Sequence, residues 1–320
     1  MPADARLRPA VRGCLALVIT VAALGAVGAG RARAAEITTA NTVVNAYYAL
    51  GSDAAAGATA IAVAATPSLV PGDVVLLHQA QGATIDTTNG EAHGAVTALN
   101  GAGHHELVRV LAVDGASVRL VTPLVNAYRA SAGAQLVKVA RYDALRVAAG
   151  ASIVAPPWDG ATGGIVAVLV AGDLVVDGAI DASARGFRGG VADNDTGYGC
   201  TSFRSSSDSN GATKGEGVAG PASAFSRPYA RGALANGGGG GNCHNAAGGG
   251  GANQVGAAPY TGHGNPDPSY FAAFDLDPYF AVGDPTTLVS SGGGRGGYSY
   301  SEDPTLSLDP TIVPPGDDDW

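Results

Sequence analysis

A glycine-rich region near the carboxyl end limits the fold of this chain more than any other feature. Between Gly186 and Gly297 lie 28 of the 49 glycines of the chain, and residues 236–251 read NGGGGGNCHNAAGGGG. A segment with so few side chains is a flexible linker, a phosphate-binding loop or a layer in which main chains pack directly on one another.

Two observations favour the packed layer. Aromatic residues such as Phe187, Tyr229 and Tyr270 are interleaved with the glycines, whereas flexible linkers carry few aromatic residues. The phosphate-binding patterns GxxxxGK[ST] and strand–GxGxxG–helix are missing from the sequence. We therefore predict polyproline II-like (PPII-like) main chains that satisfy one another's amides by hydrogen bonds to neighbouring segments.

Residues 1–34 have the pattern of a secretory signal peptide. Arg6, Arg8 and Arg12 form a basic start, an apolar run follows, and Ala32-Arg33-Ala34 gives an A-x-A cleavage pattern. The alternative is a membrane anchor, but a span needs roughly 20 apolar residues and the run is shorter. We expect cleavage near Ala34, an extracellular or bacterial cell-surface location, and no transmembrane span in the mature chain.

The mature chain is acidic. Removal of five basic residues and one acidic residue with the leader leaves 13 Lys and Arg against 26 Asp and Glu, a formal net charge of −13. Nucleic-acid binding needs a basic surface that neutralises phosphates, so we exclude this class of partner. The expected partners are cell-surface or extracellular polymers, polysaccharides among them.

Two cysteines, Cys200 and Cys243, remain after the leader is removed. An even number in an exported chain indicates a disulfide, and closing a loop of about 43 residues would stabilise the fold by about 3–4 kcal/mol. The alternative is a thiolate–imidazolium pair with His244. Because adjacent side chains of an extended chain point in opposite directions, we prefer the disulfide.

The chain from residue 35 to 154 contains short runs rich in Val, Leu and Ala, separated by turn residues. These runs span residues 42–48, 59–64, 73–79, 105–113, 117–121, 134–139 and 144–148. The pair Asp114-Gly115 between two of them is a hairpin signal. The pattern predicts a small antiparallel β-sandwich or barrel.

The pattern changes after Gly150. Very short apolar runs at 165–170, 173–176 and 179–181 are separated by Gly172-Asp173 and Asp177-Gly178. Such spacing is typical of the rungs of a parallel β-solenoid. We therefore predict a mainly β chain: a signal peptide (1–34), a β-sandwich or barrel domain (35–154), a short β-solenoid-like and glycine-rich region (155–300), and a Pro/Asp-rich tail (301–320) where the chain is truncated.

Several motifs resemble one recurrent secreted module. They are GDVVLLHQAQG (72–82), WDGATGG (158–164), DGAIDAS (177–183) and GFRGG (186–190). This combination is similar to the amino-terminal region of large glycine-rich surface proteins of gliding soil bacteria, some of them described as adventurous-gliding-motility-like. The resemblance implies a surface location and a modular architecture, and it implies no catalytic residues.

Two sets of side chains are candidates for metal binding. His104-His105-Glu106, with Glu91 and His93 nearby, offers zinc ligands but lacks the HExxH spacing, so we interpret it as a loop that enters a strand. Acidic residues that recur at short intervals offer oxygen ligands for Ca²⁺. These calcium candidates are Asp177, Asp181, Asp193 and Asp195. No other cofactor is expected.

Together these features predict an exported, non-catalytic structural or adhesive protein of the cell surface. The alternative is a β-solenoid enzyme acting on glycans, a hydrolase or lyase, or a carbohydrate-binding module. In that alternative Asp177 and Asp181 are the best acid–base pair, although Asp is also favoured at turns for backbone reasons.

Overall fold

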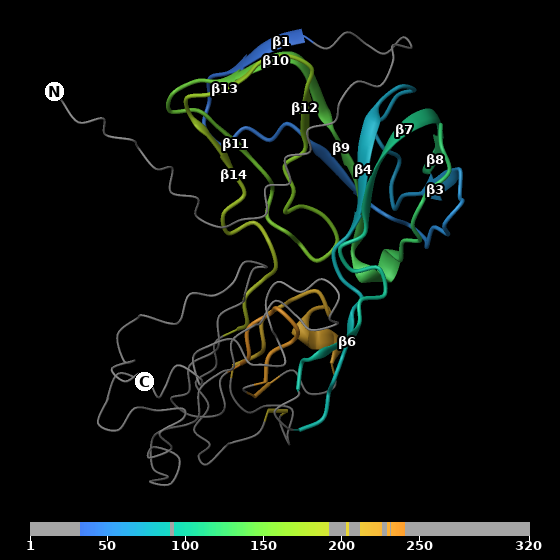
Figure 1. Cartoon of the computed structure of the whole chain (residues 1–320), viewed down its shortest axis with the longest axis vertical. Coiled ribbons are helices and arrows are strands. Elements are labelled where there is room, and N and C mark those ends of the chain that lie inside the picture. The colour runs from blue at the N-terminus through green and yellow to red at the C-terminus, as the bar shows by residue number, and fades with distance from the viewer. Residues whose placement is uncertain are drawn as a thin grey trace, which may run out of the picture.

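The computed structural model describes residues 33–89, 93–191, 203–204, 212–225, 229–230 and 232–240. These residues form β-strands and turns, with two single-turn 3₁₀ helices, η1 (Ala130–Ala132) and η2 (Ala222–Ala224) (Figure 1). The predicted mainly β fold class is confirmed. Within the described residues, no helix has the length and apolar character needed to cross a membrane.

A six-stranded antiparallel sheet forms the first structural unit. Its strands, in spatial order, are β2 (Ala46–Ala49), β9 (Ala134–Lys138), β4 (Val74–Gln79), β7 (His105–Asp114), β8 (Ser117–Leu120) and β3 (Ala60–Ala62). Each predicted run between residues 42 and 139 overlaps one of these strands. A separate two-stranded hairpin pairs β5 (Thr84–Ile85) with β6 (Val96–Ala98).

The antiparallel sheet curls until its two outer strands meet. The chain beyond β2 pairs with the chain beyond β3 in an antiparallel bridge between Leu50 and Val63. The amide of Gly51 donates to the carbonyl of Ala62 at 2.9 Å beside this bridge. The sheet therefore encloses a small barrel-like core, as predicted. This core contains the buried residues Leu50, Ile61, Val63, Val75, Leu77, Val108, Val110, Val118, Leu120, Tyr128 and Leu136.

The predicted hairpin at Asp114-Gly115 is confirmed. Strands β7 and β8 pair in antiparallel register from Asp114 opposite Ser117. Gly115 has a φ of 55°, in the left-handed region that glycine adopts more easily than other residues. The turn chemistry of the sequence thus defines this connection.

The second unit is a stack of short parallel strands at the top of Figure 1. It contains β1 (Arg33–Ile37), β10 (Ala140–Val147), β11 (Ser152–Val154), β12 (Val168–Val170), β13 (Leu174–Val176) and β14 (Ala179–Asp181). Strand β10 pairs with β1, β12 and β13, and β11 pairs with β14, all in parallel. The three runs predicted between 165 and 181 therefore form rungs.

Equivalent residues of successive rungs lie side by side. Ile37, Val147 and Val176 form one row across β1, β10 and β13. Burial of a Val or Ile side chain contributes about 1.5–3 kcal/mol, and Val147 is fully buried in this row. Val176 at the end of the row is 43% exposed, so β13 lies at an open edge of the stack within the described residues.

The antiparallel barrel is an insertion between the first and second rungs. The first rung contains β1, whereas the second contains β10 and begins only after β9 has completed the barrel. Strand pairing thus links residues on both sides of the predicted boundary at 154, through β10–β13 and β11–β14. Arg33 and Ala34, the last two residues of the predicted leader, belong to β1. The predicted division into a signal peptide and domains stays a prediction.

Two glycine-rich segments, 212–217 and 234–240, lie side by side beyond the parallel stack. The amide of Gly215 donates to the carbonyl of Gly238 at 2.7 Å, and the amide of Glu216 donates to the carbonyl of Arg188 at 2.9 Å. Gly237 and the three residues that follow it are all buried. We call these two segments the glycine layer.

Candidate functional site

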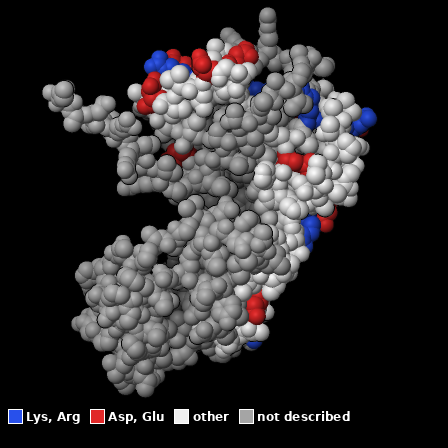
Figure 2. Space-filling model, in the orientation of Figure 1, with Lys and Arg blue, Asp and Glu red and all other residues white. Residues whose placement is uncertain are grey.

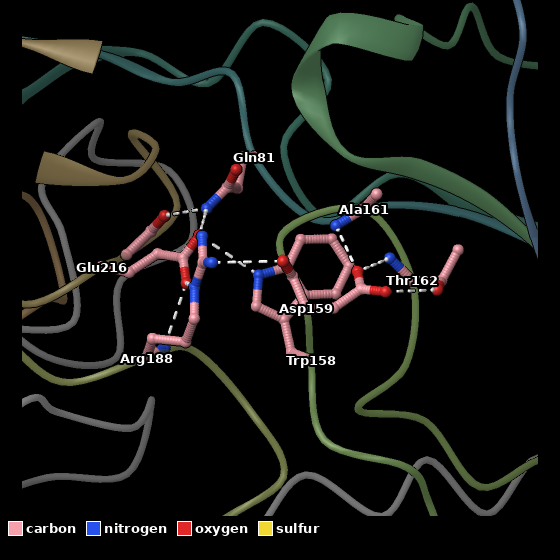
Figure 3. A network of polar contacts seen from close by, with 8 residues as sticks. Gln81, Trp158, Asp159, Ala161, Thr162, Arg188 and Glu216 are labelled. Carbon is pink, nitrogen blue, oxygen red and sulfur yellow. Dashed lines mark hydrogen bonds and ion pairs between the residues drawn. The ribbon is translucent and has the colours of Figure 1, made fainter. Parts of the chain in front are cut away.

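A buried carboxylate, that of Glu216, joins the glycine layer to the β framework (Figure 3). Its side chain is 2% exposed. Its oxygens accept hydrogen bonds from Gln81 Nε2 at 2.8 Å and from Trp158 Nε1 at 3.2 Å. Gln81 follows β4 of the barrel, and Trp158 follows β11 of the parallel stack. One side chain therefore binds all three parts of the structure.

Arg188 supplies the positive charge opposite Glu216. Its backbone amide donates to Oε2 at 3.0 Å, its Nε donates to Oε2 at 2.9 Å and its Nη2 donates to Oε1 at 3.2 Å. Burial raises the pKa of Glu216, but the donors from Arg188, Trp158 and Gln81 outweigh burial, and the pKa lies below its ordinary value. The carboxylate is therefore ionised at neutral pH.

The loop that carries Trp158 is fixed by its own hydrogen bonds. Asp159 Oδ1 accepts from the amides of Ala161 at 2.8 Å and Thr162 at 2.7 Å, as aspartate does in many turns. Gly163, with a φ of 100°, brings the chain so close that a Cβ would lie 2.5 Å from the carbonyl oxygen of Pro157. This geometry holds the Trp158 indole against Gly133, where a Cβ would lie 2.8 Å from Trp158 Cη2.

A second buried charge, Lys214, lies two residues before Glu216 and is 1% exposed. Its Nζ donates to the carbonyl oxygens of Phe203 at 2.7 Å, Ala230 at 3.0 Å and Gly232. An ammonium group can make three such bonds. Lys214 thus connects main-chain segments of the glycine-rich region.

His93 packs beside Lys214. Burial and the charge of Lys214 lower the pKa of His93 to about 4. Its Nδ1 lies 2.9 Å from the carbonyl oxygen of Thr88, and its Cδ2 lies 2.5 Å from where a Cβ of Gly232 would be. His93 is therefore a neutral, packed side chain at pH 7.

The glycine layer is built by contact between main chains. A Cβ on Gly217 would lie 2.6 Å from the amide nitrogen of Gly237 and 2.6 Å from the carbonyl oxygen of Leu234. Cβ atoms on Gly190 and Gly240 would also overlap backbone atoms, those of Thr213 and Ala212. None of these glycines has a φ in the left-handed region. Close approach of backbones, rather than turn geometry, requires glycine here.

The hydrogen-bond network around Glu216 has a structural role. We call its residues Gln81, Trp158, Arg188 and Glu216 the clamp. Five donor hydrogens reach the two oxygens of Glu216, and a carboxylate offers about four lone-pair sites. The carboxylate is thus saturated, and it would have to break bonds within the network before it could accept a proton from another molecule. A fully satisfied buried network rigidifies the elements that it joins.

The predicted calcium residues Asp177 and Asp181 lie at the end of the parallel stack. Asp177 Oδ2 accepts from Arg146 Nη2 at 2.8 Å. Arg146 Nη1 lies 3.7 Å from Glu36 Oε1. Charged side chains of both signs lie over β1, β10 and β13 in Figure 2. Hydrogen bonds from Ser183 lower the pKa of Asp181. The calcium prediction stays a prediction.

The structure describes only some of the remaining predicted residues. Cys200, Cys243, Asp193 and Asp195 lie outside the described residues, so the disulfide also stays a prediction. Glu106 accepts from the amides of Val125 and Asn126, each at 3.0 Å. In the described part of the chain, no group of three or more His, Cys, Asp or Glu side chains could hold a metal ion.

The clamp residues Gln81, Trp158, Arg188 and Glu216 were not predicted from the sequence. A usable signal was present, because Lys214-Gly215-Glu216 places two opposite charges in a segment otherwise poor in charged side chains. Charged residues in such a segment are almost never fully buried unless they are paired. Trp158 and Arg188 both lie in motifs that carry the family resemblance.

No protein-family model and no curated protein matches the chain. Among solved structures, the tailspike of Pseudomonas phage phi297 is 18% identical over 40% of this chain and 21% of that one, with a TM-score of 0.22. The tailspike of Pseudomonas phage LKA1 is 17% identical over 39% of this chain and 27% of that one, also with a TM-score of 0.22.

A third structure is the tailspike of Acinetobacter baumannii bacteriophage AP22 in complex with an A. baumannii capsular saccharide. It is 14% identical over 38% of this chain and 25% of that one, with a TM-score of 0.22. The chain spans about a quarter of the length of these tailspikes. Similarity at this level defines neither the fold nor the activity of the chain.

Proposed function

We propose that this chain is an exported, non-catalytic structural or adhesive protein of the bacterial cell surface. The observation that carries this proposal is the clamp at Glu216, which ties the glycine layer to both β units through Gln81, Trp158 and Arg188. A fully satisfied buried network makes the elements that it joins rigid, which suits a surface scaffold. The resemblance to glycine-rich surface proteins of gliding bacteria supports the same role.

The surface chemistry supports extracellular polymers, polysaccharides among them, as partners. The mature chain is strongly acidic by sequence, which favours solubility outside the cell and disfavours binding of anionic polymers. Neutral or basic polymers therefore fit this surface better than nucleic acids or polyanionic glycans do.

The test of this proposal has a localisation arm and a function arm. Antibodies against the purified chain should label intact producing cells without permeabilisation, and deletion of the gene should reduce attachment of the cells to a surface. Confinement of the chain to the cell interior would contradict the proposal.

An activity assay separates this proposal from a glycan-active enzyme. The purified chain is incubated with a panel of polysaccharides, and reducing ends are measured together with unsaturated products. We expect no turnover. Turnover that is abolished by Asp177→Asn and kept by Asp114→Asn, an exposed residue at the end of β7, would overturn the proposal and establish the enzyme.

A further inference from the structure

Two histidines, His78 on β4 and His105 on β7, lie directly opposite each other in the antiparallel sheet. The hydrogen bonds near the two ends of this strand pair define which residues exchange backbone bonds. The amide of Val110 donates to the carbonyl of Asp73 at 2.9 Å, and the amide of Gln79 donates to that of His104 at 3.0 Å. Because such bonds recur at every second residue, His78 and His105 form a non-hydrogen-bonded pair.

This type of pair brings side chains closest together. The Cα atoms of a non-hydrogen-bonded pair are about 4.5 Å apart, and both side chains project from the same face of the sheet. Two imidazoles are therefore held together by rigid strands rather than by a loop.

The hydrogen bonds of the two imidazole rings decide which ring nitrogens can bind a ligand. His105 Nδ1 lies 3.0 Å from the carbonyl oxygen of Gly103, so Nδ1 carries the proton and Nε2 keeps its lone pair. His78 Nδ1 is buried and has no hydrogen-bond partner in the part of the chain that the structure describes. On the other side of His78, the side-chain amide of Gln135 is paired with the backbone of Gly163 at 2.9 and 3.0 Å.

We propose that His78 and His105 together bind a divalent transition-metal ion, with Cu²⁺ bound more tightly than Ni²⁺ or Zn²⁺. Imidazole nitrogen suits these ions, and their affinities for nitrogen sites follow this order. The bond from His105 Nδ1 to a backbone carbonyl is the second-shell contact that orients most metal-binding histidines. His105 is exposed, so the ion can enter from solvent.

Water completes the coordination of this site. Within the described residues no third His, Cys, Asp or Glu joins the pair. The site is therefore open, unlike the closed four-ligand sites of structural zinc. The bound ion would connect β4 and β7 and leave positions free for an external ligand, which is a property beyond the structural role proposed above.

The test uses the full chain prepared without a histidine tag. Cu²⁺ is titrated by calorimetry, and the complex is studied by electron paramagnetic resonance. The variants are His105→Gln and His78→Gln. The control is His104→Gln, because His104 packs edge-on against Tyr128 with ring centroids 6.4 Å apart and makes no part of the pair.

We expect a site with spectral splitting from two imidazole nitrogens. Either pair substitution should weaken Cu²⁺ binding by at least about tenfold, since loss of even an outer-shell partner costs about 10–100-fold. His104→Gln should leave affinity and splitting unchanged. If His78→Gln does not fold, the exposed residue His105 still provides the test. Unchanged Cu²⁺ affinity and spectral splitting in His105→Gln would overturn the proposal.

Discussion

Gly217 and Gly237 lie so close together that neither can carry a side chain without displacing main chain. A Cβ on Gly217 would lie 2.6 Å from the amide nitrogen of Gly237, and a Cβ on Gly237 would lie 2.5 Å from the carbonyl oxygen of Gly215. Real Cβ contacts of this length essentially do not occur. The backbones of the glycine layer thus pack directly on one another. This contact is possible only because these residues have no side chain.

The substitution Gly217→Ala tests this packing. Overfilling a packed interior costs about 1–3 kcal/mol of the free energy of unfolding, and we expect a loss in this range, measured by urea unfolding. The control is Gly189→Ala, because Gly189 has no heavy atom within 4 Å of its Cβ position and no left-handed φ. Equal stability of the two variants would show that 212–217 and 234–240 are not packed as described.

Glu216→Gln tests the clamp. The variant keeps the shape of the side chain and removes the charge that Arg188 and Trp158 bind. Hydrogen bonds to a charged group contribute about 1.5–3 kcal/mol each, so at pH 7 the variant should be less stable by an amount in this range or above it. Trp158 fluorescence should report the change, because its Nε1 donates to Glu216. An unchanged unfolding midpoint and spectrum would contradict the clamp.

The stability difference between wild type and Glu216→Gln should depend on pH. The pKa of Glu216 is lower in the folded chain than its ordinary value of 4.5. A carboxyl with a lowered folded pKa stabilises the fold above its unfolded pKa, and this stability is lost as the pH falls through the folded value. The difference in melting temperature between wild type and Glu216→Gln should therefore be largest at pH 7 and decrease below pH 4.5. A difference that stays constant down to pH 2 would refute this assignment.

The ion pair between Arg146 and Asp177 should contribute little to stability. The two side chains are 57% and 43% exposed, and exposed pairs contribute about 0–1 kcal/mol. We expect Asp177→Asn to change the free energy of unfolding by less than about 1 kcal/mol, and added salt, which screens exposed charges, should make this change smaller still. A larger loss would mean that the ion pairs of Arg146 with Glu36 and Asp177 hold the parallel stack together.

Much of the β framework could be predicted from the sequence. The hairpin at Asp114-Gly115 and the short rungs between 165 and 181 follow from local turn chemistry and from apolar runs, which act within a few residues. The insertion of the barrel between two rungs could not be predicted, because Ile37 and Val147 pair across a long stretch of sequence. Nothing local in β1 specifies β10 as its neighbour.

The candidate site was harder to predict than the fold. The glycine runs indicated close backbone contact, but the partner of each glycine depends on the path of the chain. Burial of Glu216 depends on Arg188 and Gln81, which lie in different segments. The pairing of His78 with His105 likewise depends on strand register. The local motif His104-His105-Glu106 therefore could not predict it.

Hydrogen exchange of the backbone amides in the glycine layer tests the central claim most directly. Gly215, Glu216 and Gly240 donate to carbonyls of Gly238, Arg188 and Ala230 at 2.7, 2.9 and 3.0 Å. We predict that these amides exchange at least about a hundredfold more slowly than in an unstructured peptide, an opening free energy of about 2.7 kcal/mol or more. Exchange at the rate of an unstructured peptide would contradict an ordered glycine layer, and with it the structural role built on that layer.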